Sequence, residues 1–574
     1  MLFTNIIHRF DDSETSLQAL QWQWAEAREL GLRTTTLLTY PTLFESKLLD
    51  QAEKWLGPGD ELGLHLQNFK CSRILEKYGV REPMLWLWPR EKRMAVIDEM
   101  VEAFTARFGY PPASIGSYVM DAWTLREIER RHPSIEIAIN SCFEEGVKMY
   151  YGNNRNWLLF SDGGPWNPYF PSRGNALAPA KDSAEAINII AVPHLNRDMI
   201  LALSSRDDWF ASHPGNIFRA RINEGSECPY LFRFFDAWER QAELNGLSYL
   251  NVFVSTPWLQ GTFCFIENEA DVRALYSKTL RHFKAREEAG AVSNLTMHEF
   301  SKEFRARVAP GSAMVCHWCD ELTQTKREVI WLCNAHHRTA FDMGRGGAIV
   351  DFRPYDGRLN LDLGPETQCL WNGNAPFLIS SEHNGGHWNS SQHATISDGR
   401  HSACLCDRRL RTEVERLGPQ RWLVRARPAN FTLGGKSVVI QSEWELSEGE
   451  GIIIRRQLLD TELDAEALRL TEVFLGRAGT TEYPEDQRGI RLFAGESSLV
   501  LSYSGERIEC PGADWVGAEI PRLAISLKMV ALTETVSGSV ADCVIFSPSF
   551  RLELNFPFQS PTATCLQTRP LVNH

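Results

Sequence analysis

The feature that most constrains the fold is an alternation of short apolar runs with longer amphipathic stretches, which continues to about residue 305. The apolar runs, each with the character of a β-strand, occupy residues 2–10, 33–40, 61–67, 113–119, 135–140, 186–192, 249–255 and 293–300. Helical patterns lie between them at 16–30, 91–108, 125–131, 232–246 and 269–290. Apolar strands alternating with helices are typical of a parallel sheet covered by helices. Seven or eight such units predict a (β/α)7-8 barrel.

The pattern changes after about residue 310. Helical periodicity nearly disappears, and short β-rich segments separated by turn residues continue to the end of the chain, for example at 313–321, 326–335, 436–446 and 542–556. Such spacing is typical of an antiparallel β-sandwich. The sequence therefore predicts an α/β barrel over residues 1–308, followed by an all-β region over 309–574.

Charge and cysteine content limit the partners and the compartment. The formal net charge is -13, so an acidic surface disfavours nucleic acid and anionic membranes as partners. The first residues lack the basic segment and long apolar core of a signal peptide, and no run approaches the ~18 apolar residues of a membrane helix. The thirteen cysteines are scattered along the chain. A cytoplasmic protein with reduced thiols is expected, and the oligomeric state is left open.

Polar side chains follow most of the predicted barrel strands, at the carboxyl ends where functional residues of such barrels collect. In chain order they are His8, Asp11 and Asp12; His65 and Gln67; Asp121 and Trp123; Asn140; His194; and Glu299. Asp and Asn also cap helices that follow strands, which is the structural alternative for each one. Because several strands each contribute such a residue, we expect a catalytic rim.

Four of these segments, in order, resemble the motifs of the polysaccharide deacetylase superfamily. They are HRFDDSET, ELGLHLQNF, YPPASIGSYVMDAWTLREIERR and INIIAVPHL. The resemblance implies an α/β barrel in which Asp11 is a general base, while Asp12 and His65 bind a divalent metal. The family places a second histidine four residues after the first, where this chain has Phe69. The implied metal site is therefore incomplete, because a phenyl ring cannot ligate a metal.

The layout of a barrel followed by a β-sandwich is also similar to related glycoside hydrolases. Glycoside cleavage needs two carboxyl groups facing each other across the bond. Asp11 and Asp121 are the first candidates for this pair, with Asp12 and Glu299 as reserves. The histidines at positions 8, 65 and 194 could tune these groups or hydrogen-bond sugar hydroxyls.

The sequence thus predicts a hydrolase that acts on a carbohydrate substrate, with glycoside hydrolysis expected first and no cofactor expected. Removal of an N- or O-acyl group from a sugar, with a metal held by Asp12 and His65, is the alternative. A non-catalytic sugar-binding protein on a degenerate barrel is the second alternative.

Two loops rich in aromatic and polar residues are candidates for binding substrate. Residues 161–175 contain Trp166, Asn167, Tyr169 and Arg173, and residues 380–393 contain His387 and Trp388. Aromatic faces beside amide and guanidinium donors suit a sugar subsite. The structural alternative is a crossover loop packed by its own aromatic residues, or a polar turn of the sandwich.

Cys316, Cys319, Cys333 and His336 have a spacing that superficially resembles a zinc site. They fall in two predicted neighbouring strands, where small thiols commonly pack as apolar groups. Ordinary packing is the expected explanation.

Overall fold

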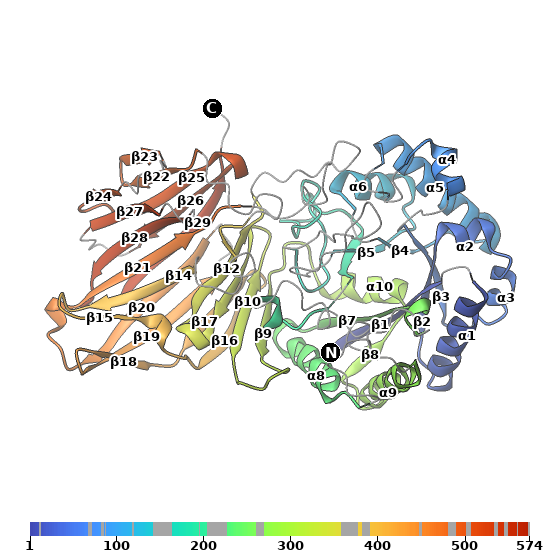
Figure 1. Cartoon of the computed structure of the whole chain (residues 1–574), viewed down its shortest axis with the longest axis horizontal. Coiled ribbons are helices and arrows are strands. Elements are labelled where there is room, and N and C mark those ends of the chain that lie inside the picture. The colour runs from blue at the N-terminus through green and yellow to red at the C-terminus, as the bar shows by residue number, and fades with distance from the viewer. Residues whose placement is uncertain are drawn as a thin grey trace. The chain divides into compact units, whose positions relative to one another are not determined.

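A computed structural model describes the 574-residue chain except residues 11–12, 67–71, 82–84, 86–87, 118–119, 142–163, 195, 204–226, 260–268, 357–376, 381–390, 447–450, 480–488, 501–506, 533–537, 545–548, 560 and 572–574. The chain divides into two compact units, and the main change from one to the other falls between Gly311 and Ser312. Each unit has its own architecture (Figure 1).

Unit 1 is built on a parallel eight-stranded sheet (Figure 1). Its strands are β1 (Leu2–Phe10), β2 (Thr34–Leu38), β3 (Glu61–His65), β4 (Ser114–Gly116), β5 (Ile137–Ser141), β6 (Ile190–Pro193), β7 (Ser248–Ser255) and β8 (Val292–Asn294). The order is β6-β5-β4-β3-β2-β1-β7, and β8 pairs with the first residues of β1. The prediction of a parallel α/β fold is therefore confirmed at the level of a half-barrel sheet.

Side-chain amides join β6 and β7, the first and last strands in this order. Asn251 of β7 donates to the carbonyl oxygens of Pro193 and His194, and its backbone N–H donates to Asn196 Oδ1 (3.0 Å). Asn196 in turn donates to the Tyr249 carbonyl (2.9 Å). These bonds tie β7 to the segment that follows β6, although β6 and β7 are not paired as strands among the described residues.

Helices connect the strands, as the amphipathic patterns predict. They are α1 (Glu14–Glu29), α2 (Tyr40–Glu45), α3 (Leu49–Glu53), α4 (Ser72–Tyr78), α5 (Arg90–Phe108), α6 (Ala122–Arg131), α8 (Pro229–Asn245), α9 (Glu269–Glu288) and α10 (Met297–Arg307). Short 3-10 turns lie at η2 (Leu201–Leu203) and η4 (Thr256–Leu259).

The sheet has two different buried faces. One apolar cluster joins alternate strand residues with α10, and its strand members include Ile7, Leu37, Ile139, Val192 and Phe253. We call this side the inner face. The other cluster joins the intervening strand residues with α1, α5 and α6, and its strand members include Leu38, Leu64, Ile115 and Ala138. Because successive strand residues point to opposite sides, parity along each strand assigns a side chain to the inner or the outer face.

Unit 2 consists mainly of two antiparallel sheets, which confirms the coarser prediction of an all-β part. The eleven-stranded sheet contains β9 (Met314–Cys319), β10 (Glu328–Cys333), β11 (His337–Asp342), β12 (Ala348–Pro354), β13 (Ile379–Ser380), β14 (Ser391–Ser397), β15 (Ser402–Cys404), β21 (Arg469–Gly476), β24 (Arg507–Cys510), β27 (Gly538–Val544) and β28 (Ser549–Pro557). The ten-stranded sheet contains β16 (Thr412–Gly418), β17 (Arg421–Ala426), β18 (Ala429–Leu433), β19 (Lys436–Leu446), β20 (Gly451–Thr461), β22 (Arg491–Ala494), β23 (Ser497–Val500), β25 (Trp515–Ile520), β26 (Ile525–Ala531) and β29 (Thr562–Pro570). Short 3-10 turns include η5 (Met343–Arg345), η7 (Leu405–Asp407), η8 (Ala465–Ala467) and η9 (Pro521–Leu523).

A buried ion pair and an aromatic contact join the two sheets. Arg456 Nε of β20 donates to Glu472 Oε1 of β21 at 3.0 Å, and Gln392 donates to the other oxygen of the same carboxylate. The Arg456 guanidinium also lies 4.9 Å from the centroid of the Trp444 ring, which in turn contacts Phe341 of the opposite sheet. Since both ionic groups are buried, each depends on the other for compensation.

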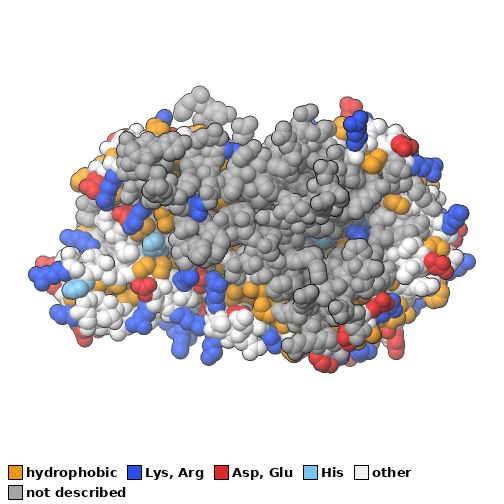
Figure 2. Space-filling view, in the orientation of Figure 1, with side chains coloured by type: hydrophobic (Ala, Val, Ile, Leu, Met, Phe, Trp, Pro, Cys, Tyr) orange, Lys and Arg blue, Asp and Glu red, His pale blue; other side chains and the backbone are white. Residues whose placement is uncertain are grey.

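Among the described residues, no helix has the length and hydrophobicity that a membrane crossing requires. On the face drawn in Figure 2, basic and acidic side chains of the described residues lie interspersed. The net charge of -13 is the balance of 60 basic and 73 acidic residues over the whole chain.

The Gly347–Trp444 contact gives a stability prediction for unit 2. Gly347 has a φ of +72°, and a Cβ atom there would collide with the Trp444 ring. Gly347→Ala should lower the free energy of unfolding by about 2 kcal/mol more than Gly399→Ala, because overpacking adds to backbone strain. Gly399 is the matched control, since its φ is +84° and its Cβ would meet open space. Chemical unfolding measures both variants, and equal losses would contradict the predicted contact.

Candidate functional site

Arg9, His65 and His194 lie on the inner face at or just beyond the carboxyl ends of β1, β3 and β6. Ile7 and Val192 lie on the inner face. Arg9 and His194 each follow one of them by two residues, so both side chains lie on the same face. The Phe253 ring of β7 lies 6.1 Å from the His65 ring and 4.7 Å from the His194 ring, measured between centroids. Segments far apart in sequence thus place two imidazoles beside one aromatic ring, and the charge of Arg9 acts on both imidazoles.

Both histidines of this inner-face cluster are uncharged near neutral pH. Burial, together with a smaller effect of the positive charge of Arg9, lowers the pKa of His194 to about 3. Burial also lowers the pKa of His65 well below its usual range, with additional contributions from Arg9 and His194. A neutral imidazole offers one N–H donor and one acceptor nitrogen, which suits hydrogen bonds to hydroxyl groups.

A glycine makes room for the His65 ring. A Cβ at Gly116 of β4 would lie 3.1 Å from His65 Cδ2 and 2.8 Å from Leu37 Cδ1. Glycine at this inner-face position therefore lets the imidazole lie against the sheet. A Cβ at Gly63 would instead collide with the Ser114 side chain, so that glycine allows close packing of β3 on β4.

His8 points to the opposite side of β1. Its Nε2 and the Tyr276 hydroxyl of α9 share a hydrogen bond of 3.0 Å, and its ring is fully buried. Burial lowers the pKa of His8 to about 3. The predicted role of His8 in substrate binding is not supported by this placement, because the ring faces the helical layer rather than the inner-face cluster.

Asp121 is held by a helix and a buried arginine. Its Oδ1 accepts from Thr124 N (2.8 Å), which makes it the N-cap of α6. Its Oδ2 accepts from Arg93 Nη1 of α5 at 2.9 Å, and both side chains are almost inaccessible. These contacts explain the carboxylate without a substrate, so the structural alternative accounts for the residue. Its predicted catalytic role stays a prediction.

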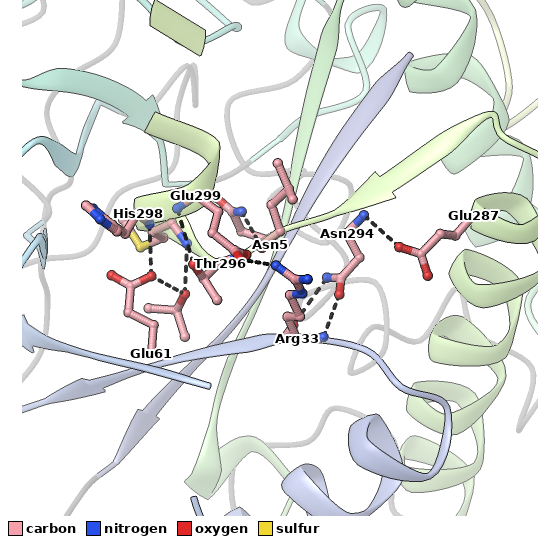
Figure 3. Close-up of polar contacts among 11 residues, drawn as sticks. Asn5, Arg33, Glu61, Glu287, Asn294, Thr296, His298 and Glu299 are labelled. Carbon is pink, nitrogen blue, oxygen red and sulfur yellow. Dashed lines mark hydrogen bonds and ion pairs between the residues drawn. The ribbon is translucent and has the colours of Figure 1, made fainter. Parts of the chain in front are cut away.

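Glu299 lies near the amino ends of the strands, opposite the inner-face cluster. The prediction that residues 293–300 form one strand is wrong, because β8 ends at Asn294 and α10 begins at Met297. Thr296 and Glu299 form a capping box in which Thr296 Oγ1 accepts from Glu299 N (3.2 Å) and Glu299 Oε2 accepts from Thr296 N (3.0 Å). Glu299 also pairs with Arg33, just before β2 (Figure 3).

The rest of α10 is bound to the same end of the sheet. Its His298 N–H donates to Glu61 Oε2 at 2.9 Å, at the first residue of β3 (Figure 3). Ser301 donates to Glu136, which immediately precedes β5 (2.7 Å). Burial raises the pKa of the Glu61 carboxyl. This polar network fixes α10 across the amino ends of the strands, so Glu299 cannot face a substrate at their carboxyl ends.

Trp123 and Asn140 are engaged by neighbouring elements. The Arg90 guanidinium lies 4.9 Å from the centroid of the Trp123 ring, covering it from α5. Asn140 of β5 is buried, and its Nδ2 donates to the Met120 carbonyl at 3.3 Å. Asn140 is therefore enclosed, whereas Trp123 is only partly buried and has one ring face next to a guanidinium.

The described part of the predicted loop at 161–175 packs against the free edge of β6. Trp166, Asn167 and Tyr169 are buried. Tyr169 exchanges backbone hydrogen bonds with Ala191, and its hydroxyl donates to the Ala176 carbonyl at 2.7 Å. Arg173 Nη2 donates to both oxygens of Glu129 (3.1 and 2.9 Å). These contacts favour the structural alternative, a loop packed by its own aromatic residues.

Several predicted residues lie outside the described part of the chain. They are Asp11, Asp12, Gln67, His387 and Trp388. Their predicted roles stay predictions. The four residues with zinc-like spacing are described, and they do not converge, since Cys316 is buried and Cys319 is exposed on the same strand.

The metal site implied by the sequence resemblance includes Asp12, which lies outside the described residues. No three His, Cys, Asp or Glu side chains are grouped to hold a metal ion within the residues that the structure describes. Among them, the groups that act on His65 are the imidazole of His194 and the cationic Arg9, whose charge opposes a divalent cation. Phe69 occupies the position of the expected second histidine.

Arg9 is the residue of this site that the sequence reasoning missed. One signal in the sequence could have found it. Arg9 stands two residues before the predicted catalytic Asp11, and alternate residues of a strand lie on the same face.

Asp121→Asn tests whether this residue is structural. The variant should lose about 3 kcal/mol of folding stability, because Arg93 is left as a buried charge without its partner. The double variant Arg93→Met/Asp121→Asn should recover part of that loss. Urea unfolding measures both. An unchanged stability combined with a lost activity would instead assign Asp121 to the chemistry.

The buried His8 gives a pH dependence. Its pKa is about 3 in the folded chain and about 6.5 when unfolded, so the unfolded chain takes up a proton first as the pH falls. Between pH 6.5 and pH 5, this should remove about 1.5 kcal/mol of stability, and His8→Gln should abolish that share. The exposed His401→Gln is the control. If the free energy of unfolding of His8→Gln falls between pH 6.5 and pH 5 by as much as that of the unchanged protein, His8 is not the cause of the effect.

No family model and no curated protein matches this chain. Solved structures with partial similarity include a Parabacteroides distasonis protein provisionally assigned as a glycoside hydrolase/deacetylase, at 16% identity and a TM-score of 0.44, covering 64% of this chain and 88% of that one. A provisionally assigned polysaccharide deacetylase from Mycobacterium smegmatis matches at 12% identity and a TM-score of 0.29, covering 53% and 90%. A galactose mutarotase-like protein from Clostridium acetobutylicum matches at 9% identity and a TM-score of 0.30, covering 45% of this chain and 99% of that one. Similarity at this level establishes no family, so the geometry of the site has to carry the functional argument.

Proposed function

We propose that this chain is a carbohydrate-active hydrolase whose reaction takes place at the carboxyl ends of β1, β3 and β6. The observation that carries the proposal is the inner-face cluster of Arg9, His65 and His194. Three of the segments that resemble polysaccharide deacetylase motifs contribute one member each. Uncharged imidazoles and an aromatic ring suit a neutral, hydroxyl-rich substrate.

Within this class, we favour hydrolysis of an acyl group on a sugar. Glycoside cleavage requires a second carboxyl group across the scissile bond, whereas Asp121 and Glu299 are held in structural contacts. Acyl hydrolysis requires one base and a cationic or hydrogen-bonding group beside the carbonyl oxygen. In the inner-face cluster, Arg9 is the cationic group.

In this proposal, Asp11 is the base because it follows Arg9 by two residues. It takes a proton from water as the water oxygen adds to the acyl carbon, and Arg9 stabilises the negative charge that develops on the carbonyl oxygen. The bond from the acyl carbon to the sugar oxygen or nitrogen then breaks, and the leaving atom receives the proton. His65 and His194 hold sugar hydroxyls, since neither takes up a proton near neutral pH.

Glycoside hydrolysis is the second candidate, and it now depends on Asp11 and Asp12 alone. A sugar-binding protein without turnover is the third. The three candidates differ in their products, because acyl hydrolysis releases a carboxylic acid, glycoside hydrolysis releases a new reducing end, and binding alone releases neither.

Asp11→Asn should lower the release of acetate from acetylated oligosaccharides by at least about 100-fold with little change in stability, because it removes the base. Acetate and new reducing ends are measured on the same samples, with and without a chelator. Glu299→Gln is the matched control, since that carboxylate lies near the amino ends of the strands. Reducing ends without acetate would move glycoside hydrolysis to first place. Activity lost on chelation would restore the metal, and glycan binding without any product, unchanged in Asp11→Asn, would favour the non-catalytic protein.

A further inference from the structure

Two cysteines of unit 2 lie close together where a strand passes into a short turn. Cys404 is the last residue of β15, and Cys406 lies in η7. Both thiols are free and only partly buried. The function proposed for unit 1 uses neither of them, and neither is among the residues that the sequence predicts to form a site.

The backbone brings the two sulfur atoms within reach of each other. The Cys406 N–H donates to Cys404 Sγ at 3.3 Å, so the sulfur of one residue lies over the main chain of the other. Residues two apart have Cα atoms separated by at most about 7 Å, and the turn at η7 shortens that span. This is the range in which disulfides form without backbone movement.

The segment that carries the two cysteines is held firmly. The Gly346 N–H donates to the Arg408 carbonyl at 2.7 Å, and Leu410 N donates to the Met343 carbonyl at 2.8 Å. A Cβ at Gly346 would collide with the Leu405 carbonyl, which shows how closely the η5 turn packs on η7. Backbone hydrogen bonds therefore fix the main chain on both sides of the two cysteines.

The two thiols differ in acidity. Hydrogen bonding from Cys406 lowers the pKa of Cys404 to about 7, while the same interaction raises the pKa of Cys406. A substantial share of Cys404 is therefore thiolate at neutral pH, and the thiolate is the reactive form of cysteine. The pair thus has a nucleophilic sulfur beside a second sulfur that can resolve the product.

We propose that Cys404 and Cys406 form a redox-active dithiol that a peroxide oxidises to an intrachain disulfide. The Cys404 thiolate attacks one peroxide oxygen, the O–O bond breaks, and the departing oxygen leaves as hydroxide, which gives a sulfenic acid on Cys404. The Cys406 sulfur then attacks the Cys404 sulfur and water leaves. Two thiols are oxidised by two electrons, and one peroxide is reduced. Because the closed loop is very short, the disulfide stabilises the fold little and should be readily reduced.

The test uses hydrogen peroxide on the full-length protein, followed by alkylation and trypsin digestion without reductant. Cleavage after Arg400 and Arg408 yields a peptide of residues 401–408 that contains both cysteines and no other. We expect this peptide to become two hydrogens lighter and to lose both alkylatable thiols, and a reductant should restore them. The rate of thiol loss should rise about tenfold from pH 6 to pH 8, as the thiolate fraction of Cys404 increases.

Two variants and a control make the result specific. In Cys406→Ser the reaction should stop at the sulfenic acid, which dimedone traps on Cys404, whereas Cys404→Ser should react more slowly. Cys319→Ser removes an exposed thiol elsewhere and should leave the 401–408 peptide unchanged. A peptide that gains oxygen on Cys404 while Cys406 stays alkylatable would overturn the proposal. So would survival of both thiols under conditions that oxidise Cys319.

Discussion

The alternation of side chains along β1 is the constraint on which the rest of unit 1 depends. β1 pairs with β2, β7 and β8, so its parity sets which residues of the neighbouring strands share a face. Arg9 therefore joins His65 and His194 on the inner face, while His8, one residue earlier, joins Tyr276 among the helices. A shift by one residue would exchange the two sets, and the histidine against α9 would become the histidine of the site.

The two ends of the sheet have different tasks. At the amino ends, partly buried carboxylates receive N–H groups at the start of α10, which satisfies donors that a helix would otherwise leave without partners. At the carboxyl ends, the inner face carries a guanidinium and two imidazoles, and burial of the two imidazoles costs stability wherever they would have to take up a proton. Parallel α/β proteins commonly separate stability and chemistry in this way. Glu299, in a capping box at the amino ends, and Asp121, ion-paired just beyond the carboxyl end of β4, both show that a carboxylate near a strand end can be held by structural contacts.

Much of the fold could be predicted from local pattern, because strand and helix periods are properties of neighbouring residues. The apolar run at 2–10 is β1 itself, and the amphipathic run at 91–108 is α5 extended by one residue. The run at 293–300 was misassigned because its apolar residues fit both periods, although Thr296 followed three residues later by Glu299 is a capping-box signal. Asp121 followed three residues later by Thr124 is a similar signal. By contrast, burial of Trp166 and Tyr169 depends on packing against β6, which no local pattern records.

The site itself could be predicted only in part, because charge states depend on what tertiary structure brings together. His65 and His194 stand out in the sequence as strand-end histidines, but their neutrality follows from burial and from the nearby cation of Arg9. That cation also alters the chemistry available. A fixed positive charge beside two neutral imidazoles opposes a divalent cation and stabilises an oxyanion, whereas a neighbouring carboxylate acts in the opposite direction. The net charge of -13 therefore says little about the site, because the few charges nearest the reacting atoms, rather than the total, set the local field.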